Sequence, residues 1–378
     1  MLKSVKIENF RGFKSFELQQ LGRVNLLVGK NNSGKTSILE AIQLLCSRNN
    51  LEPLRQAMTK RGEFYFDENS NNSQELDVRN LFYGHEINIG SKFSIAGSND
   101  NLSEELVVSI ESRIITSVTQ NVTPNTIFPD LLNHEFIESS EELLFFNINW
   151  NNKQGEEPLR RPLSSKGGLA IDHVRRFRGD TKNAAPKVQF ITSSSLDAEK
   201  MIELFDQIVL TPEEKLVEQA VNIIDSKIQR IAPISSIKFR GSLDGSRGGF
   251  FVLLSEINQR VPIGSMGDGV WRMLGLALAI VSAKDGYLFV DEIDTGLHFT
   301  AMSDMWRMIW ETAKRLNVQV FATTHNSDCW MSLASIAQRD DAAEDGIRIH
   351  RIEQGKDKSI VFTEPQIVIA AEREIEVR

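Results

Sequence analysis

The chain has 378 residues, of which 41% are apolar and 25% charged, so it can bury a large core as a globular protein of two or three folding units. A formal net charge of −8 argues against a protein that coats nucleic acid over its whole surface, although a local basic groove is compatible with it. The two cysteines give no disulfide framework or metal spacing. No apolar run reaches the ~18 residues of a membrane helix, and the N-terminus lacks a secretory signal, so a cytoplasmic location is expected.

Residues 2–20 alternate apolar and polar side chains on either side of Gly12, which predicts a β-hairpin. Arg11 lies at the bend of this hairpin. Its side chain could reach a bound nucleotide, or it could face solvent as an ordinary turn residue.

An apolar strand-like run at 24–28 leads into the sequence GKNNSGKT at 29–36, and an apolar helical stretch follows. This strand–GxxxxGK[ST]–helix context predicts a phosphate-binding P-loop. Glycines let successive N–H groups point at phosphate oxygens, and the helix N-terminus adds roughly half a positive charge. Lys35 is expected to bridge the β- and γ-phosphates, with the Thr36 hydroxyl on Mg²⁺. The predicted nucleotide-binding residues are Gly29, Lys30, Asn31, Asn32, Ser33, Gly34, Lys35, Thr36, Ser37 and Arg11.

The composition changes after residue 48, and we expect a β-rich and helical subdomain at 49–240 inserted between two halves of the ATPase core, 1–48 and 241–378. Its first strands are expected to pack beside the N-terminal hairpin. The patterns predict strands at 87–96, 106–118, 143–150, 188–192 and 235–240, and helices at 197–209 and 212–231.

Basic side chains outnumber acidic ones between residues 158 and 187. This stretch is a solvated or partner-binding loop, or alternatively it contacts a nucleic-acid backbone. Its candidate contact residues are Arg160, Arg161, Arg175, Arg176 and Arg178.

The remaining chain alternates helices and strands, which implies a mainly parallel sheet covered by helices. Strands are expected at 249–255, 260–263, 287–290 and 318–322, helices at 269–283, 299–315 and 326–338, and a hairpin at 346–352 and 359–362 before a short polar tail. The apolar stripe of helix 299–315, which includes Met302, Met305, Trp306, Ile309 and Trp310, predicts a core-facing side or, alternatively, a subunit interface.

Two polar pairs follow successive strands of this predicted sheet. Asp291 and Glu292 end the run YLFVDE, where Asp291 is expected to hold the metal and Glu292 to act as general base on the attacking water. The next strand ends at Thr324-His325, and His325 could hydrogen-bond the γ-phosphate or that water.

A second anion site is predicted at Ser265-Met266-Gly267-Asp268-Gly269, where a small hydroxyl and backbone N–H groups precede an apolar helix. A single nucleotide site within one chain has no obvious use for two groups of residues that each bind the γ-phosphate. Two copies placed head to tail would use both, with ATP between them.

The order GKNNSGKT, SMGDG, LFVDE and TTH resembles the ABC-type ATPase heads of SMC proteins, RecF and the OLD (overcoming lysogenization defect) family. The chain is most similar to compact bacterial and cyanobacterial ATPases of the AAA_15/AAA_21 type, over roughly 1–48 and 262–370. The resemblance implies an α/β P-loop ATPase head with a mainly parallel central sheet, an N-terminal antiparallel β-subdomain and an inserted region.

The resemblance also implies roles for particular residues. Lys35 and Thr36 bind phosphate and Mg²⁺, Asp291 and Glu292 are the Walker B metal and catalytic carboxylates, and His325 is the switch histidine. Ser265 to Gly269 are the signature motif acting in trans, and Asp294 belongs to the D-loop at the dimer interface. The signature reads SMGDG rather than LSGGQ, so Asp268 places a carboxylate near the triphosphate. No residue stands out as the glutamine of the Q-loop, for which Gln74 is the nearest candidate.

The insertion lacks the heptads of an SMC coiled coil, and the stretch after His325 is too short for the TOPRIM nuclease domain of OLD proteins. We therefore expect an ATP- and Mg²⁺-dependent ATPase that dimerises and regulates a separately encoded effector, by family analogy a nuclease or TOPRIM-type protein in antiphage defence or a toxin–antitoxin-like system. The alternative is a RecF-like repair ATPase that binds duplex DNA directly, and a further one is an ATP-binding scaffold with negligible turnover.

Overall fold

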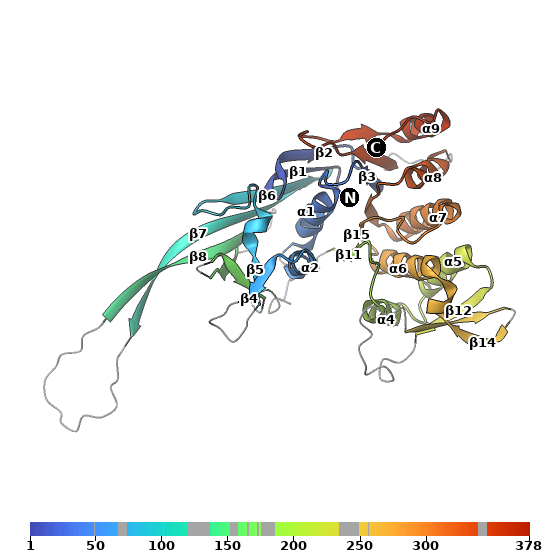
Figure 1. Cartoon of the computed structure of the whole chain (residues 1–378), viewed down its shortest axis with the longest axis horizontal. Helices are drawn as coiled ribbons and strands as arrows, with labels where there is room; N and C mark the ends of the chain where they lie inside the picture. Colours follow the sequence, from blue (N-terminus) through green and yellow to red (C-terminus); the bar gives the residue numbers. More distant parts are fainter. Residues whose placement is uncertain are drawn as a thin grey trace, which may run out of the picture.

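The computed structural model describes residues 1–48, 50–66, 74–100, 102–119, 137–151, 158–164, 166–171, 174, 186–233, 249–255, 257–338 and 346–378. The described chain has an arm-bearing half and a helical half joined by a central sheet (Figure 1). The arm is a two-stranded ribbon of β7 (Ser103–Thr119) and β8 (Ile137–Asn151), which projects far from the body.

The central sheet has the strand order β11-β15-β16-β3-β17-β18. Its strands are β11 (Val188–Ile191), β15 (Tyr287–Val290), β16 (Gln319–Thr323), β3 (Val24–Val28), β17 (Ile347–Arg351) and β18 (Ile360–Phe362). All neighbours are parallel except β17 and β18, which form the expected hairpin. The fold class predicted from the sequence, an α/β ATPase head with a mainly parallel central sheet, is confirmed.

Both faces of this sheet are covered, which explains why four of the five residues of β3 are apolar and all five are buried. The exception, Asn25, donates hydrogen bonds to the carbonyls of Gly22 and Val320. Alternate side chains point to opposite faces. Leu26, Leu288 and Val320 pack into one core, whereas Leu27 and Phe289 pack into the other. The first core lies under the helices α6 (Asp268–Ser282), α7 (Phe299–Leu316) and α8 (Ser327–Ala337), and the second lies under α1 (Lys35–Ser47) (Figure 1).

The N-terminal hairpin of β1 (Ser4–Phe10) and β2 (Phe13–Leu18) belongs to a six-stranded antiparallel sheet, β2-β1-β6-β7-β8-β9. β6 (Lys92–Ser98) pairs with β1, so the expectation that the inserted strands pack beside the hairpin is confirmed. β9 (Leu159–Pro162) forms the far edge. A small sheet of β10 (Gly168–Ala170), β5 (Gln74–Asp77) and β4 (Phe64–Phe66) lies near α2 (Glu52–Lys60), with the 3₁₀ turn η1 (Val78–Leu81) after β5.

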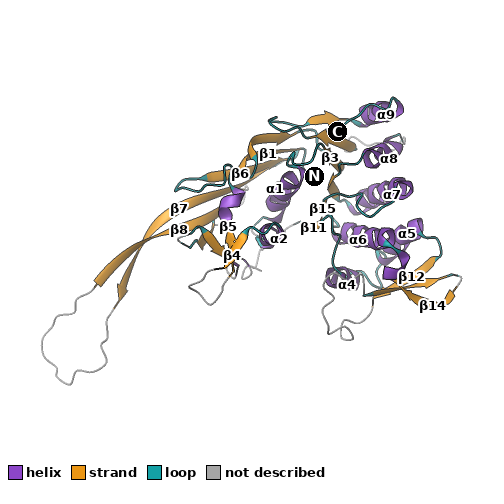
Figure 2. Cartoon of the chain, in the orientation of Figure 1, coloured by secondary structure: helices purple, strands orange, loops and turns teal. Residues whose placement is uncertain are grey.

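The helical half contains α4 (Ala198–Asp206), α5 (Glu214–Ile224), α6 (Asp268–Ser282), α7 (Phe299–Leu316), α8 (Ser327–Ala337) and α9 (Glu364–Glu372). A sheet of β12 (Ile228–Pro233), β13 (Phe250–Leu254) and β14 (Ile257–Pro262) adjoins α5, and the 3₁₀ turn η3 (Ile263–Met266) precedes α6. Figure 2 shows most of the labelled helices in this half, α1 and α2 on the side of the arm, and the long strands β7 and β8 in the arm.

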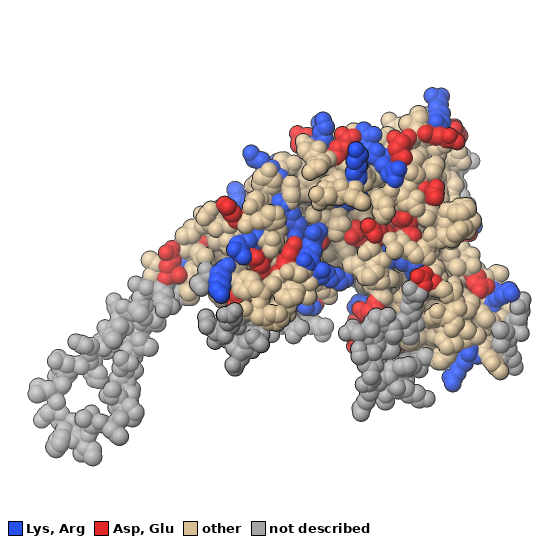
Figure 3. All heavy atoms as spheres, viewed as in Figure 1, with Lys and Arg blue, Asp and Glu red and all other residues tan. Residues whose placement is uncertain are grey.

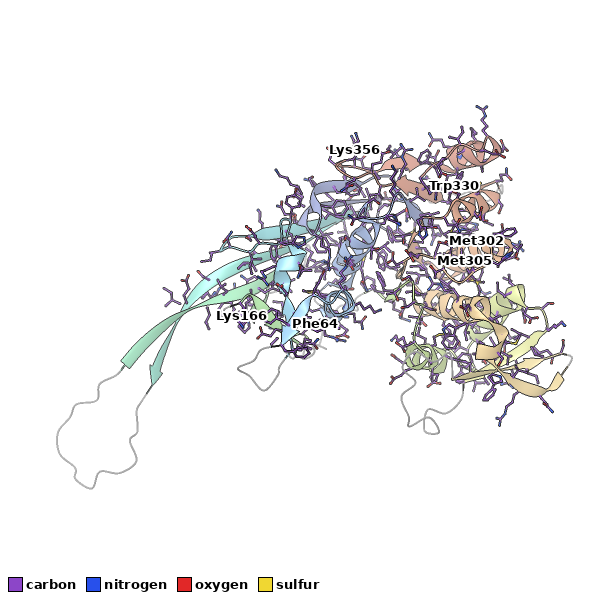
Figure 4. The ribbon with its side chains drawn as sticks, in the orientation of Figure 1. Phe64, Lys166, Met302, Met305, Trp330 and Lys356 are labelled. Atoms are coloured by element: carbon purple, nitrogen blue, oxygen red, sulfur yellow. The ribbon has the colours of Figure 1, made fainter. Side chains whose placement is uncertain are left out.

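The apolar stripe of α7 faces the core, because Trp306 is fully buried and donates its indole N–H to the carbonyl of Cys329 at 2.9 Å. Met302 and Met305 on α7 and Trp330 on the neighbouring helix α8 are labelled in Figure 4, and all three are buried.

Three sequence predictions in this half differ from the structure. The helix predicted over 212–231 ends at Ile224. Asp225 has an extended backbone, and strand β12 follows from Ile228. The polar tail forms α9, which begins at a capping box of Thr363 and Gln366 and buries Ile367. The insertion predicted at 49–240 contains β11, which is a strand of the central sheet. The strand predicted at 235–240 lies outside the described residues.

No helix in the described part of the chain combines the length and apolar character needed to cross a membrane.

Candidate functional site

The loop between β3 and α1 has the backbone of a phosphate cradle. Gly29 and Gly34 have φ angles of 146° and 90°, which favour glycine. A Cβ on Gly29 would collide with the carbonyl of Ile352, and one on Gly34 would collide with the ring of Phe13. The Ser33 hydroxyl is buried, and none of the described residues hydrogen-bonds to it. A phosphate oxygen is a suitable partner for this group.

Lys35 is held inside this loop. Its Nζ donates hydrogen bonds of 2.9 Å to the carbonyls of Gly29 and Lys30. Burial lowers the pKa of the Lys35 ammonium, and the nearby carboxylates of Asp291 and Glu292 oppose that shift. The loop therefore presents a fixed cation at the N-terminus of α1, as phosphate binding requires.

Thr36 and Asp291 meet beside the P-loop. The Thr36 hydroxyl donates to the two carboxylate oxygens of Asp291 at 3.0 and 3.1 Å, and the Thr323 hydroxyl donates to Oδ1 of Asp291 at 2.6 Å. These are hard oxygen ligands, and Mg²⁺ in nucleotide sites uses one or two carboxylates together with phosphates and waters. Thr36 and Asp291 therefore fit the role of holding Mg²⁺.

Glu292 and His325 lie at the open side of the site. His325 Nδ1 is 3.7 Å from Glu292 Oε1, and the two side chains are 51% and 42% exposed, respectively. Glu292 has a φ of 47°, a strained conformation for this residue type, and its N–H donates to the Thr323 hydroxyl at 2.8 Å. A carboxylate held this way and open to solvent can accept a proton from water.

Hydrogen bonds fix the loop that carries His325 from two sides. Thr324 donates its hydroxyl proton to Asp294 at 2.7 Å, and Asp294 is buried, so this bond joins the two loops. On the other side, Arg378 Nη1 donates to the carbonyl of His325 at 2.5 Å, and the Ser327 hydroxyl donates to Glu376 at 3.3 Å.

The signature motif faces solvent. Ser265 and Met266 belong to η3, Gly267 has a φ of 91°, and α6 begins at Asp268. Ser265, Gly267 and Asp268 are exposed, and a Cβ on Gly269 would approach the carbonyl of Gly296. No described residue of the motif lines the cleft beside Thr36 and Asp291.

Arg11 does not reach toward the P-loop, which corrects the prediction that it binds nucleotide. Its side chain is 6% exposed and pairs with Glu40 at 2.9 Å and with Glu63 at 2.6 Å. Glu40 also accepts from Arg61 at 2.8 Å. These four residues, Arg11, Glu40, Arg61 and Glu63, form an ion network that joins the hairpin bend to α1 and to the end of α2.

We expect Arg11→Met to lower the free energy of unfolding by about 3–5 kcal/mol, because it leaves the carboxylate of Glu63 buried without its charge partner. The matched control is Arg79→Met, which breaks an exposed pair with Asp77 and should cost about 1 kcal/mol or less. Urea denaturation measures both. Equal losses for the two variants would mean that the network does not stabilise the fold.

A cleft of about 450 Å³ adjoins the metal-binding pair, between α1, α2 and the end of β11. Lys60 and Arg61 line it from α2, and Thr192, Ser193 and Ser194 line it from β11. None of these residues stands out in the sequence. Gln74 lies in β5 and does not line this cleft, so it is not supported as the Q-loop residue. Figure 3 shows basic and acidic side chains side by side where the two halves meet.

Only part of the basic stretch at 158–187 lies within the described residues. Arg175, Arg176 and Arg178 lie outside the described residues. Arg160 and Arg161 are neighbours in β9 and therefore point to opposite faces of the sheet, with Arg160 exposed and Arg161 half-buried. Only Arg160 of these two belongs to an open surface.

Comparisons with known proteins agree with this geometry. Residues 1–329 match the family model AAA_15, the AAA ATPase domain. An ATP/GTP phosphatase of Helicobacter pylori is 22% identical over 362 residues, covering 91% of this chain and 90% of that protein. The DNA replication and repair protein RecF of Streptococcus uberis is 22% identical over 358 residues, covering 86% and 93%.

Among solved structures, an SMC head bound to the C-winged helix domain of ScpA is similar, with a TM-score of 0.46 and 13% identity over 96% of this chain and 98% of that one. The family model spans most of the sequence, and the P-loop at 29–36 as well as Asp291 and Glu292 lie within it. The chain therefore belongs to the AAA ATPase domain family AAA_15.

Proposed function

We propose that this protein hydrolyses ATP, with Lys35 and the P-loop amides binding the phosphates and Glu292 acting as general base. The observation that carries the proposal is the convergence of Lys35, Thr36, Asp291 and Glu292 at one sheet edge. When bound, Mg²⁺ neutralises charge on the β- and γ-phosphates. Glu292 accepts a proton as the water oxygen attacks the γ-phosphorus, and ADP leaves when the β–γ bond breaks. His325 orients the water or the γ-phosphate.

Hydrolysis is tested first on the purified chain. Phosphate release is measured with ATP and with GTP, since the Helicobacter relative is named for both, each with Mg²⁺ and with EDTA. We expect Mg²⁺-dependent release that is lost in Glu292→Gln. No release from either nucleotide would favour the ATP-binding scaffold instead.

We further propose that two copies join head to tail around ATP, each supplying Ser265 to Gly269 to its partner's nucleotide. In support, the motif is exposed and lies apart from its own cleft, and Glu292 and His325 are open on the side where a partner would approach. The N–H groups that begin α6 and the Ser265 hydroxyl suit a γ-phosphate.

Mixing two inactive variants tests the composite site. Lys35→Ala and Ser265→Arg should each be inactive alone, but their heterodimer contains one intact site. An equal mixture should recover about one quarter of wild-type hydrolysis, since half of the dimers are mixed and each has one working site of two. An inactive mixture in which heterodimers are verified by crosslinking would refute the arrangement.

We also propose that the ATPase controls a separate effector protein, by the family analogy with nuclease or TOPRIM-type partners in antiphage defence or toxin–antitoxin-like systems. The projecting β7–β8 arm, on which Ile114 is 72% exposed, offers a surface for such a partner. A pull-down with Glu292→Gln, ATP and Mg²⁺ from the native host should recover a stoichiometric protein. Recovery of DNA alone, lost at moderate salt, would favour repair.

Direct DNA binding is the second candidate function, favoured by the similarity to RecF over most of the chain. If the basic stretch contacts the DNA backbone, Arg160→Glu should weaken duplex binding. It should also reduce the slope of log affinity against log salt concentration by about one unit per lost phosphate contact. Lys356→Glu, which makes the same charge change on an exposed loop far from β9, is the control (Figure 4). An unchanged salt dependence of DNA binding, both in Arg160→Glu and in a variant with the charges of Arg175, Arg176 and Arg178 reversed, would rule out this function.

A further inference from the structure

Arg272 connects three parts of the site through its buried side chain. It lies on α6, one turn after the signature motif, and is 3% exposed. Its Nη1 donates to the carbonyl of Thr192 at 2.8 Å, at the end of β11. Its Nη2 donates to the carbonyls of Asp291 at 3.3 Å and Glu292 at 2.9 Å, just after β15.

This guanidinium is costly to bury. Within the described residues its hydrogen bonds go to backbone carbonyls rather than to carboxylates, and Nε has no hydrogen-bond partner there. Burial lowers the pKa of Arg272 to about 10, and Asp294, Asp291 and Glu292 oppose the shift, so the group remains charged at neutral pH. Apolar residues commonly replace such buried charges without loss of stability, which makes a role beyond packing worth testing.

The backbone of Glu292 shows what the contacts achieve. This residue has a left-handed φ of 47°, and a strained conformation persists only where its surroundings determine it. Its N–H is bound by Thr323 and its carbonyl by Arg272, so both sides of the residue are held. The direction of the Glu292 carboxylate depends on this backbone.

We propose that Arg272 is the positioning residue for Glu292, and that it links the carboxylate to the helix that begins in the signature motif. This inference rests on the proposed ATP hydrolysis. Because α6 carries both the motif and Arg272, a shift of α6 on contact with a second copy's nucleotide moves the groups that hold Glu292.

The test is Arg272→Lys, which keeps the charge but cannot reach all three carbonyls. We expect kcat to fall about 10- to 100-fold, the scale of a misplaced catalytic group, while KM and the affinity for a fluorescent ATP analogue change less than about twofold. Arg23→Lys is the matched control, because Arg23 also donates to backbone carbonyls, those of Ala313 and Val318, but away from the site. Its kcat should equal that of the wild type.

Two further measurements separate positioning from simple stabilisation. Millimolar guanidinium should restore kcat in Arg272→Ala, whereas equal NaCl should not. In a Glu292→Gln background, Arg272→Lys should lower hydrolysis no further, because both changes act through one group. If Arg272→Lys does not fold, Arg272→Gln takes its place in both kinetic comparisons.

The outcomes distinguish the two proposals. Hydrolysis that survives Glu292→Gln refutes the proposed function and this inference together. Hydrolysis that depends on Glu292 but is unchanged in folded Arg272→Lys refutes the inference alone, as does a lowered Tm with unchanged kcat.

Discussion

Glu292→Gln is expected to lower kcat for ATP hydrolysis by about 10²- to 10⁴-fold, the usual contribution of a general base. The amide cannot accept a proton from the attacking water. Nucleotide binding should survive, since the contacts of Lys35, Thr36 and Asp291 do not involve the Glu292 side chain. The variant should therefore accumulate as an ATP-bound dimer, because the step that would release it is blocked.

Phosphate release and size-exclusion chromatography in ATP and Mg²⁺ measure the two consequences. Glu311→Gln, which makes the same change on an exposed position of α7, is the control for the substitution itself. Hydrolysis by Glu292→Gln at the control rate would mean that another group activates the water. A monomeric, ATP-loaded Glu292→Gln would retain the catalytic assignment but contradict the head-to-tail dimer.

Lys35→Ala is expected to raise the dissociation constant for ATP by at least about 100-fold, since charge-assisted contacts in a half-buried site contribute about 1.5–3 kcal/mol each and Lys35 would make more than one. The free loop already shows this cation fixed on two carbonyls beside Asp291. Hydrolysis and ATP-dependent dimerisation should both disappear.

Fluorescent-nucleotide titration measures the affinity, with Lys356→Ala as the control for removal of an exposed lysine. Thermal denaturation without nucleotide shows whether the loop remains folded when the two carbonyls lose their donor. Near-wild-type affinity in a folded Lys35→Ala would place the phosphates elsewhere and remove the basis of the proposed function.

The sequence predicted the site where its chemistry is local. The P-loop and the pair Asp291-Glu292 are contiguous patterns, so the sequence alone could indicate that Lys35, Thr36 and Asp291 belong to one site. The structure brings these residues together, and their roles in phosphate and metal binding stay proposals. The parallel sheet followed from the alternation of helices and strands. Short-range signals were enough for these features.

The remaining features depend on burial and on partners distant in the sequence. Arg11 looked like a turn residue because Glu63 lies 52 positions away. Arg272 had no visible function because Thr192, 80 positions away, comes beside it only in the folded chain. Helix α9 was predicted as a tail because its apolar residues at 367–371 are consecutive and show no one-sided helical period, and only Ile367 and Ala370 among them are buried. Such positions need tertiary context that periodicity does not supply.

The place of β3 in the sheet has a consequence for biosynthesis. This strand pairs only with β16 and β17, which lie about 290 residues and more beyond it in the sequence. At roughly 5–20 residues per second, the ribosome needs about 15–60 s to make the intervening chain. During that time this mostly apolar strand, in which only Asn25 is polar, lacks its native neighbours, and such long-range pairing is intrinsically slow to form. We therefore expect nascent chains halted before β16 to be aggregation-prone and to depend on chaperones, even though the finished protein is well packed.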